Sequence, residues 1–570
     1  MYCNKQNVNI LTSLLLAHGV RQAVVCPGSR NAPIVHNLCL CGQVRCFPVT
    51  DERSAAFFAL GLILATGEPA AICVTSGTAL LNVAPAVAEA FYQRLPLVVI
   101  SADRPEAWIG QLDGQTLPQQ DALAHFVNLS VSLPSVTDDE VSRWHCNRLV
   151  NEALMALHFP APAPVHVNIP ITEPLFDFSV SSLPQERVVT QRFHHGHGCP
   201  EWVAEQWFKA RRPLVVFGQC RKDKLFQEND DWRCAQHLLS TRGVLLSERL
   251  CGYPLPMTPV DEAMAYIGDD EHYTPDLIIY AGGHVVSKRL KAFLRKATSV
   301  KTIMLTPDGR MEDVTMHAQE VVELPHPADF IYALGRIGKQ MKEDTSVAQN
   351  TREAQCEYHS WWQKAFDKIT ALKEEESFVF SQMEVVRYFE QQIEDMEEVV
   401  VHYANSSPVR LANIFADHAI YCNRGVNGIE GSLSTAAGHA SATESMVVCV
   451  IGDLSFFYDQ NALWNRNLKG NLRILLLNNG SGGIFRQLEG LRQSDAFDQY
   501  VSGTHQTTAQ GICTQNDIGY LHAANKEEMR MAMVTLLTTS TNRPMLLEVF
   551  TDADQDTATL QKFYSHLASL

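Results

Sequence analysis

The sequence lacks the long apolar runs that membrane-spanning helices need, because no hydrophobic segment reaches about 18 residues. It also has no basic segment followed by an apolar core of the signal-peptide type at its amino terminus. Basic residues are in deficit, with 46 Lys and Arg against 63 Asp and Glu, for a net charge of −17. Such a charge disfavours nucleic acids and anionic membranes as partners. We therefore expect a cytoplasmic protein with no nucleic-acid partner and no stable membrane insertion.

Two motifs common among metal- and nucleotide-binding proteins are also missing. The fifteen cysteines include no CxxC pair, and Cys39, Cys41 and Cys46 have no histidine or second cysteine pair nearby to complete a zinc site. No GxGxxG motif follows a predicted strand, which counts against a regulatory or non-enzymatic nucleotide-binding protein. We interpret the cysteines as reduced, mostly buried thiols.

Short apolar runs alternate with helical segments along most of the chain, which predicts an α/β fold of three doubly wound domains. The expected domains are residues 1–180, 181–370 and 371–570, consistent with a length of 570 residues at about 150 per domain. The expected strands are 22–26, 44–48, 70–75, 97–101 and 165–169; then 213–217, 244–247, 276–280 and 301–305; then 399–403, 419–422, 446–451, 472–477 and 545–550. Residues 178–212 and 340–375 break the pattern and are interpreted as linkers. His194, His195 and His197 in the first linker are either a metal site or exposed linker residues.

Two polar motifs follow neighbouring apolar runs in the third domain. Gly452-Asp453 ends the run 446–451, and Asn478-Asn479 ends the run 472–477. Ligands of open parallel sheets bind beyond the carboxyl ends of the strands, so Asp453 and Asn479 should lie side by side. A carboxylate and an amide oxygen suit Mg²⁺ that holds a phosphate. The alternative is an ordinary αβ unit with turn residues at its strand ends.

This pair of motifs resembles the metal–diphosphate motif of the thiamine-diphosphate enzymes. The resemblance implies pyrimidine-binding, central and diphosphate-binding domains in that order, as in the pyruvate-oxidase-like enzymes. It also implies bound thiamine diphosphate, with Mg²⁺ or Mn²⁺ held by Asp453, Asn479 and the backbone carbonyl of Ser481. It further implies a homodimer or a dimer of dimers, with the cofactor between the first domain of one subunit and the third domain of its partner.

A carboxylate at the start of an apolar helix is the candidate for cofactor activation. In thiamine enzymes a glutamate at the position of Glu52 hydrogen-bonds N1′ of the aminopyrimidine. Next to Phe57 and Phe58 this carboxylate should lose hydration, which would raise its pKa. The alternative is an acid that merely complements the positive end of the helix.

Other cofactor contacts rest on the same resemblance. Thr75, Ser76 and Gly77 connect a strand to a helix, where small residues allow close approach of a ligand; plain helix capping is the alternative. Ile429 corresponds to the apolar residue that supports the bent cofactor, although a lone isoleucine is otherwise ordinary core. The remaining assigned contacts are Gly452, Leu454, Ile484 and Phe485.

Five cations in this acidic chain lie near predicted strand ends, which favours a pocket for carboxylates. They are Arg30, Arg104, Lys288, Arg410 and Arg424. Solvated surface cations are the alternative for any one of them.

Several short segments resemble the 2-succinyl-5-enolpyruvyl-6-hydroxy-3-cyclohexene-1-carboxylate (SEPHCHC) synthase family. They are Pro27-Gly28-Ser29-Arg30, Asp51-Glu52-Arg53-Ser54, Thr75-Ser76-Gly77-Thr78-Ala79, Ala102-Asp103-Arg104-Pro105, Asn423-Arg424-Gly425 and Gly452-Asp453-Leu454-Ser455 with Tyr458-Asp459. The resemblance implies decarboxylation of 2-oxoglutarate and 1,4-addition of the succinyl unit to isochorismate, in menaquinone biosynthesis. The substrate residues it implies are Ser29, Arg30, Arg104, Gln115, Lys288, Asn405, Ser406, Arg410 and Arg424.

The chain departs from this family at a few positions. Gly114 replaces a frequent Asn, Glu430 replaces a frequent Asp, and Gly480-Ser481 replaces Asn-Gly. A carbonyl ligand survives any side chain, so the last change leaves the metal motif intact. The alternative enzyme is another thiamine-dependent 2-oxo-acid lyase, such as an acetolactate-synthase-like enzyme, which would need fewer cations.

Overall fold

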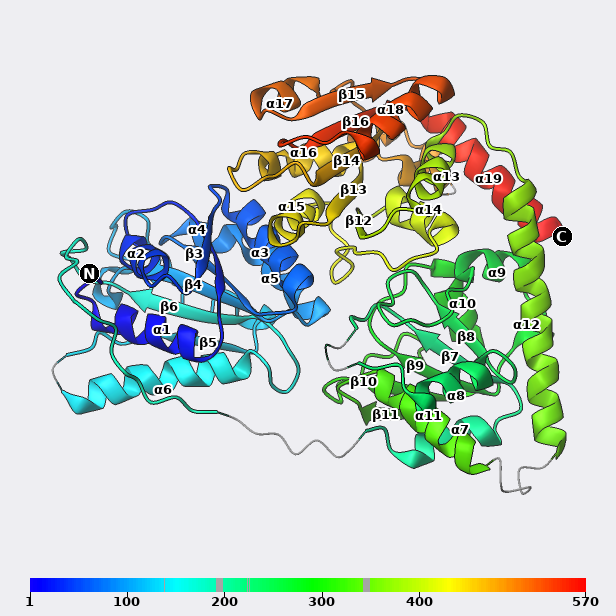
Figure 1. Ribbon diagram of the computed structural model, residues 1–570, viewed down its shortest axis with the longest axis horizontal. Coiled ribbons are helices and arrows are strands. Elements are labelled where there is room, and N and C mark those ends of the chain that lie inside the picture. The colour runs from blue at the N-terminus through cyan, green and yellow to red at the C-terminus, as the bar shows by residue number, and fades with distance from the viewer. Residues whose placement is uncertain (138, 191–197, 223, 225, 342–348, 489) are drawn as a thin grey trace.

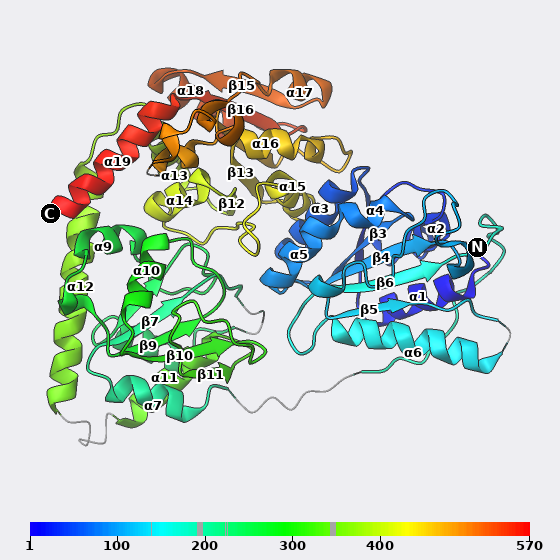
Figure 2. The same cartoon turned by 180° about the vertical axis from the view of Figure 1, so that it is seen from behind.

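Three parallel β-sheets, each flanked by helices, organise the chain in the computed structural model (Figures 1 and 2). The structure describes residues 1–570 except 138, 191–197, 223, 225, 342–348 and 489. Each sheet is assembled from a different third of the sequence, with crossovers between non-consecutive neighbours. The expected α/β fold of three domains is therefore confirmed. The histidines at 194, 195 and 197 lie outside the described residues.

The first sheet has six strands in the order β2-β1-β3-β4-β6-β5. Its strands are β1 Gln22–Val25, β2 Arg45–Pro48, β3 Ala70–Val74, β4 Leu97–Asp103, β5 Leu129–Ser132 and β6 Val165–Pro170. Its helices are α1 Gln6–Ala17, α2 Ala32–Leu40, α3 Glu52–Thr66, α4 Thr78–Asn82, α5 Ala84–Gln93 and α6 Glu140–Ala156. The central strands β3 and β4 are buried throughout, as continuous apolar runs in a parallel sheet should be.

The central sheet has five strands in the order β11-β10-β9-β7-β8. Its strands are β7 Pro213–Phe217, β8 Val244–Ser247, β9 Leu277–Ala281, β10 Lys301–Thr306 and β11 Glu320–Glu323. Its helices are α7 Glu201–Lys209, α8 Asp230–Leu239, α9 Val260–Ile267, α10 Lys288–Lys296 and α11 Ala328–Met341.

The third sheet has five strands in the order β12-β13-β14-β16-β15. Its strands are β12 Val399–Tyr403, β13 Met446–Gly452, β14 Leu472–Asn478, β15 Gly519–Ala523 and β16 Met545–Phe550. Its helices are α13 Gln382–Ile393, α14 Ser407–Phe415, α15 Ser432–Ala442, α16 Asp453–Tyr458, α17 Gln510–Gln515, α18 Lys526–Thr538 and α19 Ala553–Ser569.

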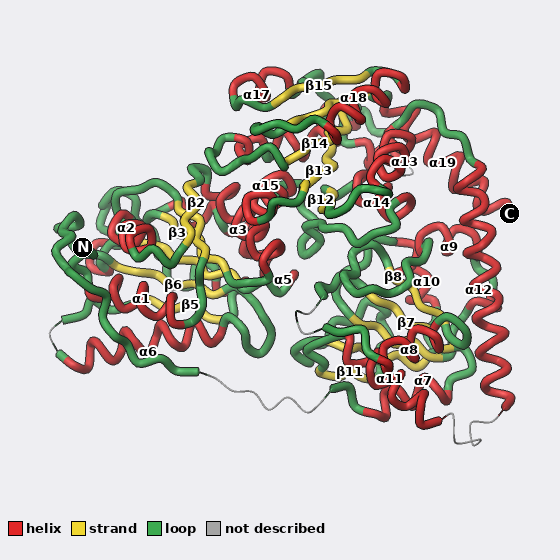
Figure 3. Tube along the Cα trace, viewed as in Figure 1, coloured by secondary structure: helices red, strands yellow, loops and turns green. Residues whose placement is uncertain are grey.

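The segment 340–375, interpreted as a linker, is largely a helix instead. Figure 3 shows α12, Gln349–Glu375, as one long helix at the edge of the molecule, and the expected boundary at residue 370 falls inside it. Its apolar stripe, formed by Tyr358, Trp362, Ile369 and Leu372, is buried in a core that the central and third domains share. The high charge of the exposed face hides this stripe in the sequence, which explains the wrong interpretation.

Strand predictions fail mainly at sheet edges. Strands β5, β11 and β15 were not predicted, because edge strands are short and half-polar here. The expected strand 419–422 is absent, and only Tyr421 forms an isolated bridge, to His402. Among the helices of the described residues, none has the length and apolarity to cross a membrane.

The first and third domains of the chain pack through a close contact between α3 and α15. A Cβ atom on Gly61 would lie 2.0 Å from the carbonyl oxygen of Thr435, and one on Gly438 would lie 2.0 Å from that of Phe58. Only glycine permits this backbone approach. The contact fixes how the two domains of one chain are oriented.

Candidate functional site

The carboxyl ends of β13 and β14 bring Asp453 and Asn479 together. Gly452 pairs with Leu477 in the register of the two parallel strands, so the residues that follow meet at one edge of the sheet. One oxygen of Asp453, Oδ2, accepts hydrogen bonds from the backbone N–H of Asn479 at 3.1 Å and of Ser481 at 3.2 Å. The other, Oδ1, accepts one from Leu454 N–H at 2.6 Å. Burial raises the pKa of Asp453, against the opposing effect of these hydrogen bonds.

A tight turn after β14 presents the oxygens of Asn479 and Ser481. Gly480 has a positive φ of 72°, and its N–H donates to Asn478 Oδ1 at 3.0 Å. The Ser481 carbonyl already accepts a hydrogen bond from Gly483 N–H at 2.9 Å, which leaves one lone pair available. The His505 ring nitrogen Nε2 lies 3.5 Å from Asp453 Oδ2.

The oxygens at this edge suit a hard divalent cation. The Asp453 carboxylate lies beside the turn that carries the Asn479 amide oxygen and the Ser481 carbonyl, and oxygens of these kinds are the ligands of Mg²⁺ or Mn²⁺. Among the described residues, no group of three or more His, Cys, Asp and Glu side chains is arranged to hold a metal. A cation at this edge would therefore depend on Asp453 together with neutral oxygens.

Further predicted cofactor residues surround the same edge. Ser455, on α16, donates from its hydroxyl to the Ile429 carbonyl, which ties the Gly-rich loop to α16. The Ile429 side chain is 41% exposed, so it is not a core residue in the single chain. Leu454 packs near Gly503, and Ile484 and Phe485 belong to the short 3₁₀ helix Gly483–Gln487 that follows the turn.

Glu52 is the first residue of α3, half-buried beside the carboxyl end of β1. Its neighbour Asp51 caps α3 by accepting from Ser54 N–H at 2.9 Å, and it also accepts from Asn461 Nδ2 at 2.7 Å. Burial and the nearby Glu52 charge raise the pKa of the Cys26 thiol well above its usual range. Glu52 therefore lies at the carboxyl edge of the first sheet.

The loop Thr75-Ser76-Gly77 lies at the same edge and touches the Ser29 turn. A Cβ atom on Gly28 would lie 2.4 Å from Thr75 Cβ, and Gly77 has a positive φ of 86°. Gln119 fixes the loop by accepting from Gly77 N–H at 2.6 Å and donating to the Ala102 carbonyl at 3.0 Å. Gln119 was missed, because no motif in the sequence marks it.

Three more predicted substrate residues lie beside this loop. Arg30 donates to the Ile171 carbonyl at 2.9 Å and contacts Glu173 at 3.1 Å. Arg104 contacts Asp113 at 2.9 Å and lies 4.0 Å from Glu173. Gln115 packs against Gly77, where an added Cβ atom would lie 3.2 Å from the Gln115 backbone. The structure thus gathers Ser29, Arg30, Glu52, Thr75, Ser76, Gly77, Arg104 and Gln115 at one edge.

The other predicted substrate residues lie on the third and central domains. Asn405 donates to the carbonyls of Asn423 at 2.6 Å and Gly428 at 2.8 Å, and its oxygen accepts from Arg424 at 3.0 Å. Ser406, just before α14, has a positive φ of 77°, a strained conformation for a non-glycine residue that is typical of functional sites. Arg424 follows an isolated bridge and not a strand, contrary to the prediction.

Arg410 and Arg424 are candidate ligands for an anion. Each has a buried Nε–H with no hydrogen-bond acceptor among the described residues. Burial and the Arg424 charge lower the pKa of Arg410. Two neighbouring cations whose Nε–H groups have no acceptor among the described residues suit an anionic ligand.

The central domain adds a cation that was not predicted. Lys288 does not follow a strand end but begins α10 and is exposed. Lys291, one turn later, is half-buried, and burial together with the Arg424 charge lowers its pKa. Burial, together with the nearby charges of Lys291 and Arg424, lowers the pKa of His284 to about 4. The three-residue spacing, which places Lys288 and Lys291 on one helical face, is the sequence signal that indicates Lys291.

The Arg424 loop of the third domain contacts the first domain of the same chain. Glu89, in the middle of α5, accepts from Gly425 N–H and Val426 N–H, both at 2.7 Å, so the Arg424 loop rests on α5. Helix α5 leads into the start of β4, whereas Arg104 follows the end of β4, Leu97–Asp103. The seven residues of this strand span roughly 20 Å. The Arg424 loop therefore rests on a helix that precedes β4, whereas the first-domain group lies at the carboxyl ends of the strands.

Comparisons with known proteins agree with this architecture. Residues 7–125 match the family model of the thiamine pyrophosphate enzyme N-terminal TPP binding domain, and residues 409–549 match that of the C-terminal TPP binding domain. A 2-succinyl-5-enolpyruvyl-6-hydroxy-3-cyclohexene-1-carboxylate synthase of Bacteroides thetaiotaomicron is 41% identical, over 100% of both chains. Its namesake in Phocaeicola vulgatus is 40% identical over 100% of this chain and 99% of its own. The one in Desulfotalea psychrophila is 33% identical, over 96% of this chain and 98% of its own. The chain belongs to the 2-succinyl-5-enolpyruvyl-6-hydroxy-3-cyclohexene-1-carboxylate synthase family of thiamine-diphosphate enzymes.

Proposed function

We propose that this enzyme decarboxylates 2-oxoglutarate and adds the resulting succinyl unit to isochorismate in a 1,4-addition, which forms SEPHCHC for menaquinone biosynthesis. The observation that carries the proposal is the sequence identity of 41% and 40%, over the full length, to two SEPHCHC synthases. The neighbouring Arg410 and Arg424, each with a buried Nε–H, support it, because both substrates are dianions and the protein as a whole is acidic.

Bound thiamine diphosphate would supply the electron sink for decarboxylation and carbon–carbon bond formation. Glu52 would hydrogen-bond the aminopyrimidine and hold a proton there, while Thr75, Ser76 and Gly77 pack beside it. Asp453, Asn479 and the Ser481 carbonyl would hold Mg²⁺ or Mn²⁺, which neutralises the diphosphate. Ile429 would support the bent cofactor. Gly452, Leu454, Ile484 and Phe485 would surround the diphosphate.

The cations would orient the two substrates. Ser406 and Arg410 would bind the distal carboxylate of 2-oxoglutarate, since Arg410 has an unsatisfied donor. The residues proposed for isochorismate are Ser29, Arg30, Arg104, Gln115, Lys288, Asn405 and Arg424. Fixing both reactants in one geometry makes the addition effectively intramolecular.

We propose that the complete site forms between two copies of the chain. Within one copy, the residues proposed to bind the aminopyrimidine and those proposed to bind the cation lie on different domains, and a second copy would bring the two sets together. Apolar side chains on both domains are exposed in the single chain, with Leu112 at 103% and Ile429 at 41%. A two-fold dimer, alone or within a dimer of dimers, would cover both. The fifteen free cysteines fit a cytoplasmic location.

A donor screen tests the proposed reaction. With isochorismate, thiamine diphosphate and Mg²⁺, we expect 2-oxoglutarate to exceed pyruvate in kcat/KM by about 30-fold or more, because only 2-oxoglutarate offers a second carboxylate to Arg410. Mass spectrometry of the product and release of CO₂ measure the turnover. Equal use of pyruvate would indicate the acetolactate-synthase-like alternative. Cofactor binding without decarboxylation of either acid would indicate a non-enzymatic binding protein.

A further inference from the structure

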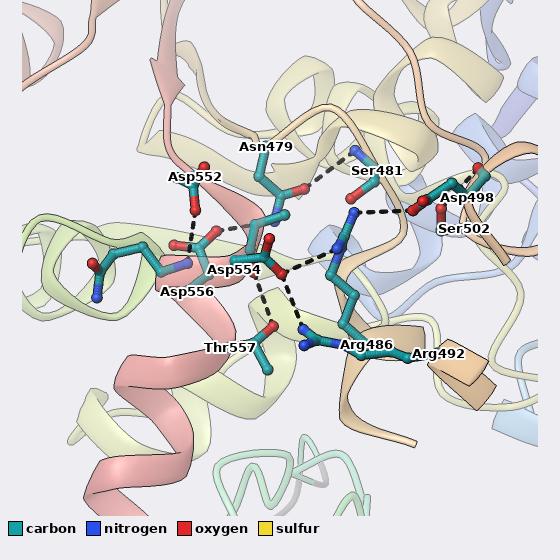
Figure 4. A network of polar contacts seen from close by, with 12 residues as sticks. Asn479, Ser481, Arg486, Arg492, Asp498, Ser502, Asp552, Asp554, Asp556 and Thr557 are labelled. Atoms are coloured by element: carbon teal, nitrogen blue, oxygen red, sulfur yellow. Dashed lines mark hydrogen bonds and ion pairs between the residues drawn. The ribbon is translucent and has the colours of Figure 1, made fainter. Parts of the chain in front are cut away.

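The Asn479 side chain can bind a cation with only one end of its amide group. Its amide oxygen is a possible ligand, whereas its NH₂ group only donates hydrogen bonds. In the structure Nδ2 donates to Asp556 Oδ2 at 2.9 Å, and Oδ1 accepts from Ser481 N–H at 3.3 Å (Figure 4). The same Ser481 N–H also donates to Asp453 Oδ2 at 3.2 Å, so the oxygen end of Asn479 lies on the side of Asp453. An ionised carboxylate accepts only, so it can hold the NH₂ end and never the oxygen end.

Asp556 is itself fixed from three directions. It lies in the first turn of α19, and the Thr551 hydroxyl donates to the same Oδ2 at 2.8 Å. Its Oδ1 accepts from the backbone N–H of Gln382, at the start of α13, at 2.7 Å. Because all three partners act as donors, the carboxylate is satisfied and its orientation is set. It lies outside every sequence motif that marks the site.

We propose that Asp556 is a positioning residue that holds the Asn479 amide with its oxygen toward Asp453, and so completes the divalent-cation site. This inference rests on the metal site of the proposed function. Partners of this kind fix the orientation of metal ligands, and their loss costs about 10- to 100-fold in metal affinity.

Replacing Asp556 with Asn is the sharpest perturbation, because the shape is nearly unchanged. The Gln382 N–H can only donate, so it should attract the new amide oxygen and turn the new NH₂ group toward Asn479. Asn479 should then flip and present NH₂ to the cation. We expect Mn²⁺, titrated by electron paramagnetic resonance with thiamine diphosphate present, to bind about 10- to 100-fold more weakly.

Two further variants distinguish an effect on the orientation of the Asn479 amide from an effect on the stability of α19. Asp552 caps this helix by accepting from Gln555 N–H at 2.8 Å without contacting Asn479, so Asp552→Asn should leave Mn²⁺ affinity within about twofold. Combining Asn479→Asp with Asp556→Asn places a carboxylate at position 479, so an oxygen faces the cation whichever way that side chain turns. This exchanged pair should regain most of the lost affinity.

Each outcome is decisive once thermal denaturation shows that the variants fold. Wild-type affinity in Asp556→Asn, an equal loss in Asp552→Asn, or no recovery in the exchanged pair would overturn the positioning role. If the wild-type protein itself fails to bind Mn²⁺ with thiamine diphosphate, the proposed metal site fails and the inference falls with it. A metal site without this orientation effect would leave the proposed function standing.

Discussion

Replacing Asp453 with alanine is expected to weaken Mg²⁺-dependent binding of thiamine diphosphate by more than about 100-fold, a larger loss than that of an outer-shell partner. Asp453 is the only ionised side chain proposed to hold the cation, and its oxygens also organise the turn through Asn479 and Ser481 N–H. Without it the diphosphate faces the site with little neutralisation. Isothermal titration calorimetry, with Mg²⁺ and with a chelator, measures the effect.

A second acidic residue provides the matched control for this experiment. Asp498 lies in the segment after the turn and pairs with Arg486 at 3.5 Å, with its side chain 75% exposed. Asp498→Ala removes the same charge from the neighbourhood and should leave cofactor affinity within about twofold. Unchanged cofactor affinity in Asp453→Ala would show that the metal is bound elsewhere.

Replacing Arg410 with alanine is expected to lower kcat/KM for 2-oxoglutarate by about 30- to 1,000-fold, equivalent to about 2 to 4 kcal/mol for a lost charge-assisted contact. Its buried Nε–H has no acceptor among the described residues, which suits a carboxylate that arrives with the substrate. Thiamine diphosphate affinity should change little, because Arg410 is not among the residues proposed to hold the diphosphate or the cation. Steady-state kinetics with varied 2-oxoglutarate measures the loss.

The corresponding control is an arginine on the protein surface. Arg233 on α8 pairs with Asp230 at 3.0 Å and is largely exposed, so Arg233→Ala should keep kcat/KM within about twofold. A loss below about threefold in Arg410→Ala would place the substrate carboxylate at another cation.

The central strands and the Asp453 edge follow from local sequence. Continuous apolar runs must be buried on both faces, and parallel strands bring their carboxyl ends together, so Asp453 and Asn479 could be paired without a structure. Lys291, Glu89 and Asp556 could not. Each lies near a residue that is distant in the sequence, through a hydrogen bond or a charge interaction that only the packing of domains or helices creates.

Two wrong interpretations have a common physical origin. Helix α12 is charged on its exposed face, and its apolar stripe meets a partner only because the central and third domains share one core. The segment before Arg424 has the composition of a strand but makes only a single bridge at Tyr421. In both cases tertiary packing, rather than local preference, decides the structure.

A mixing experiment tests most directly whether an active synthase is built from two chains. Glu52→Gln and Asp453→Ala, each nearly inactive alone, are unfolded in equal amounts, mixed and refolded, and turnover of 2-oxoglutarate with isochorismate is measured. In a two-fold dimer with shared sites, about half of the dimers are mixed, and each has one site with both changes and one with neither. We expect about a quarter of wild-type activity to return. If both residues act within one chain, every site carries a change, and a mixture as inactive as its components would contradict the shared site.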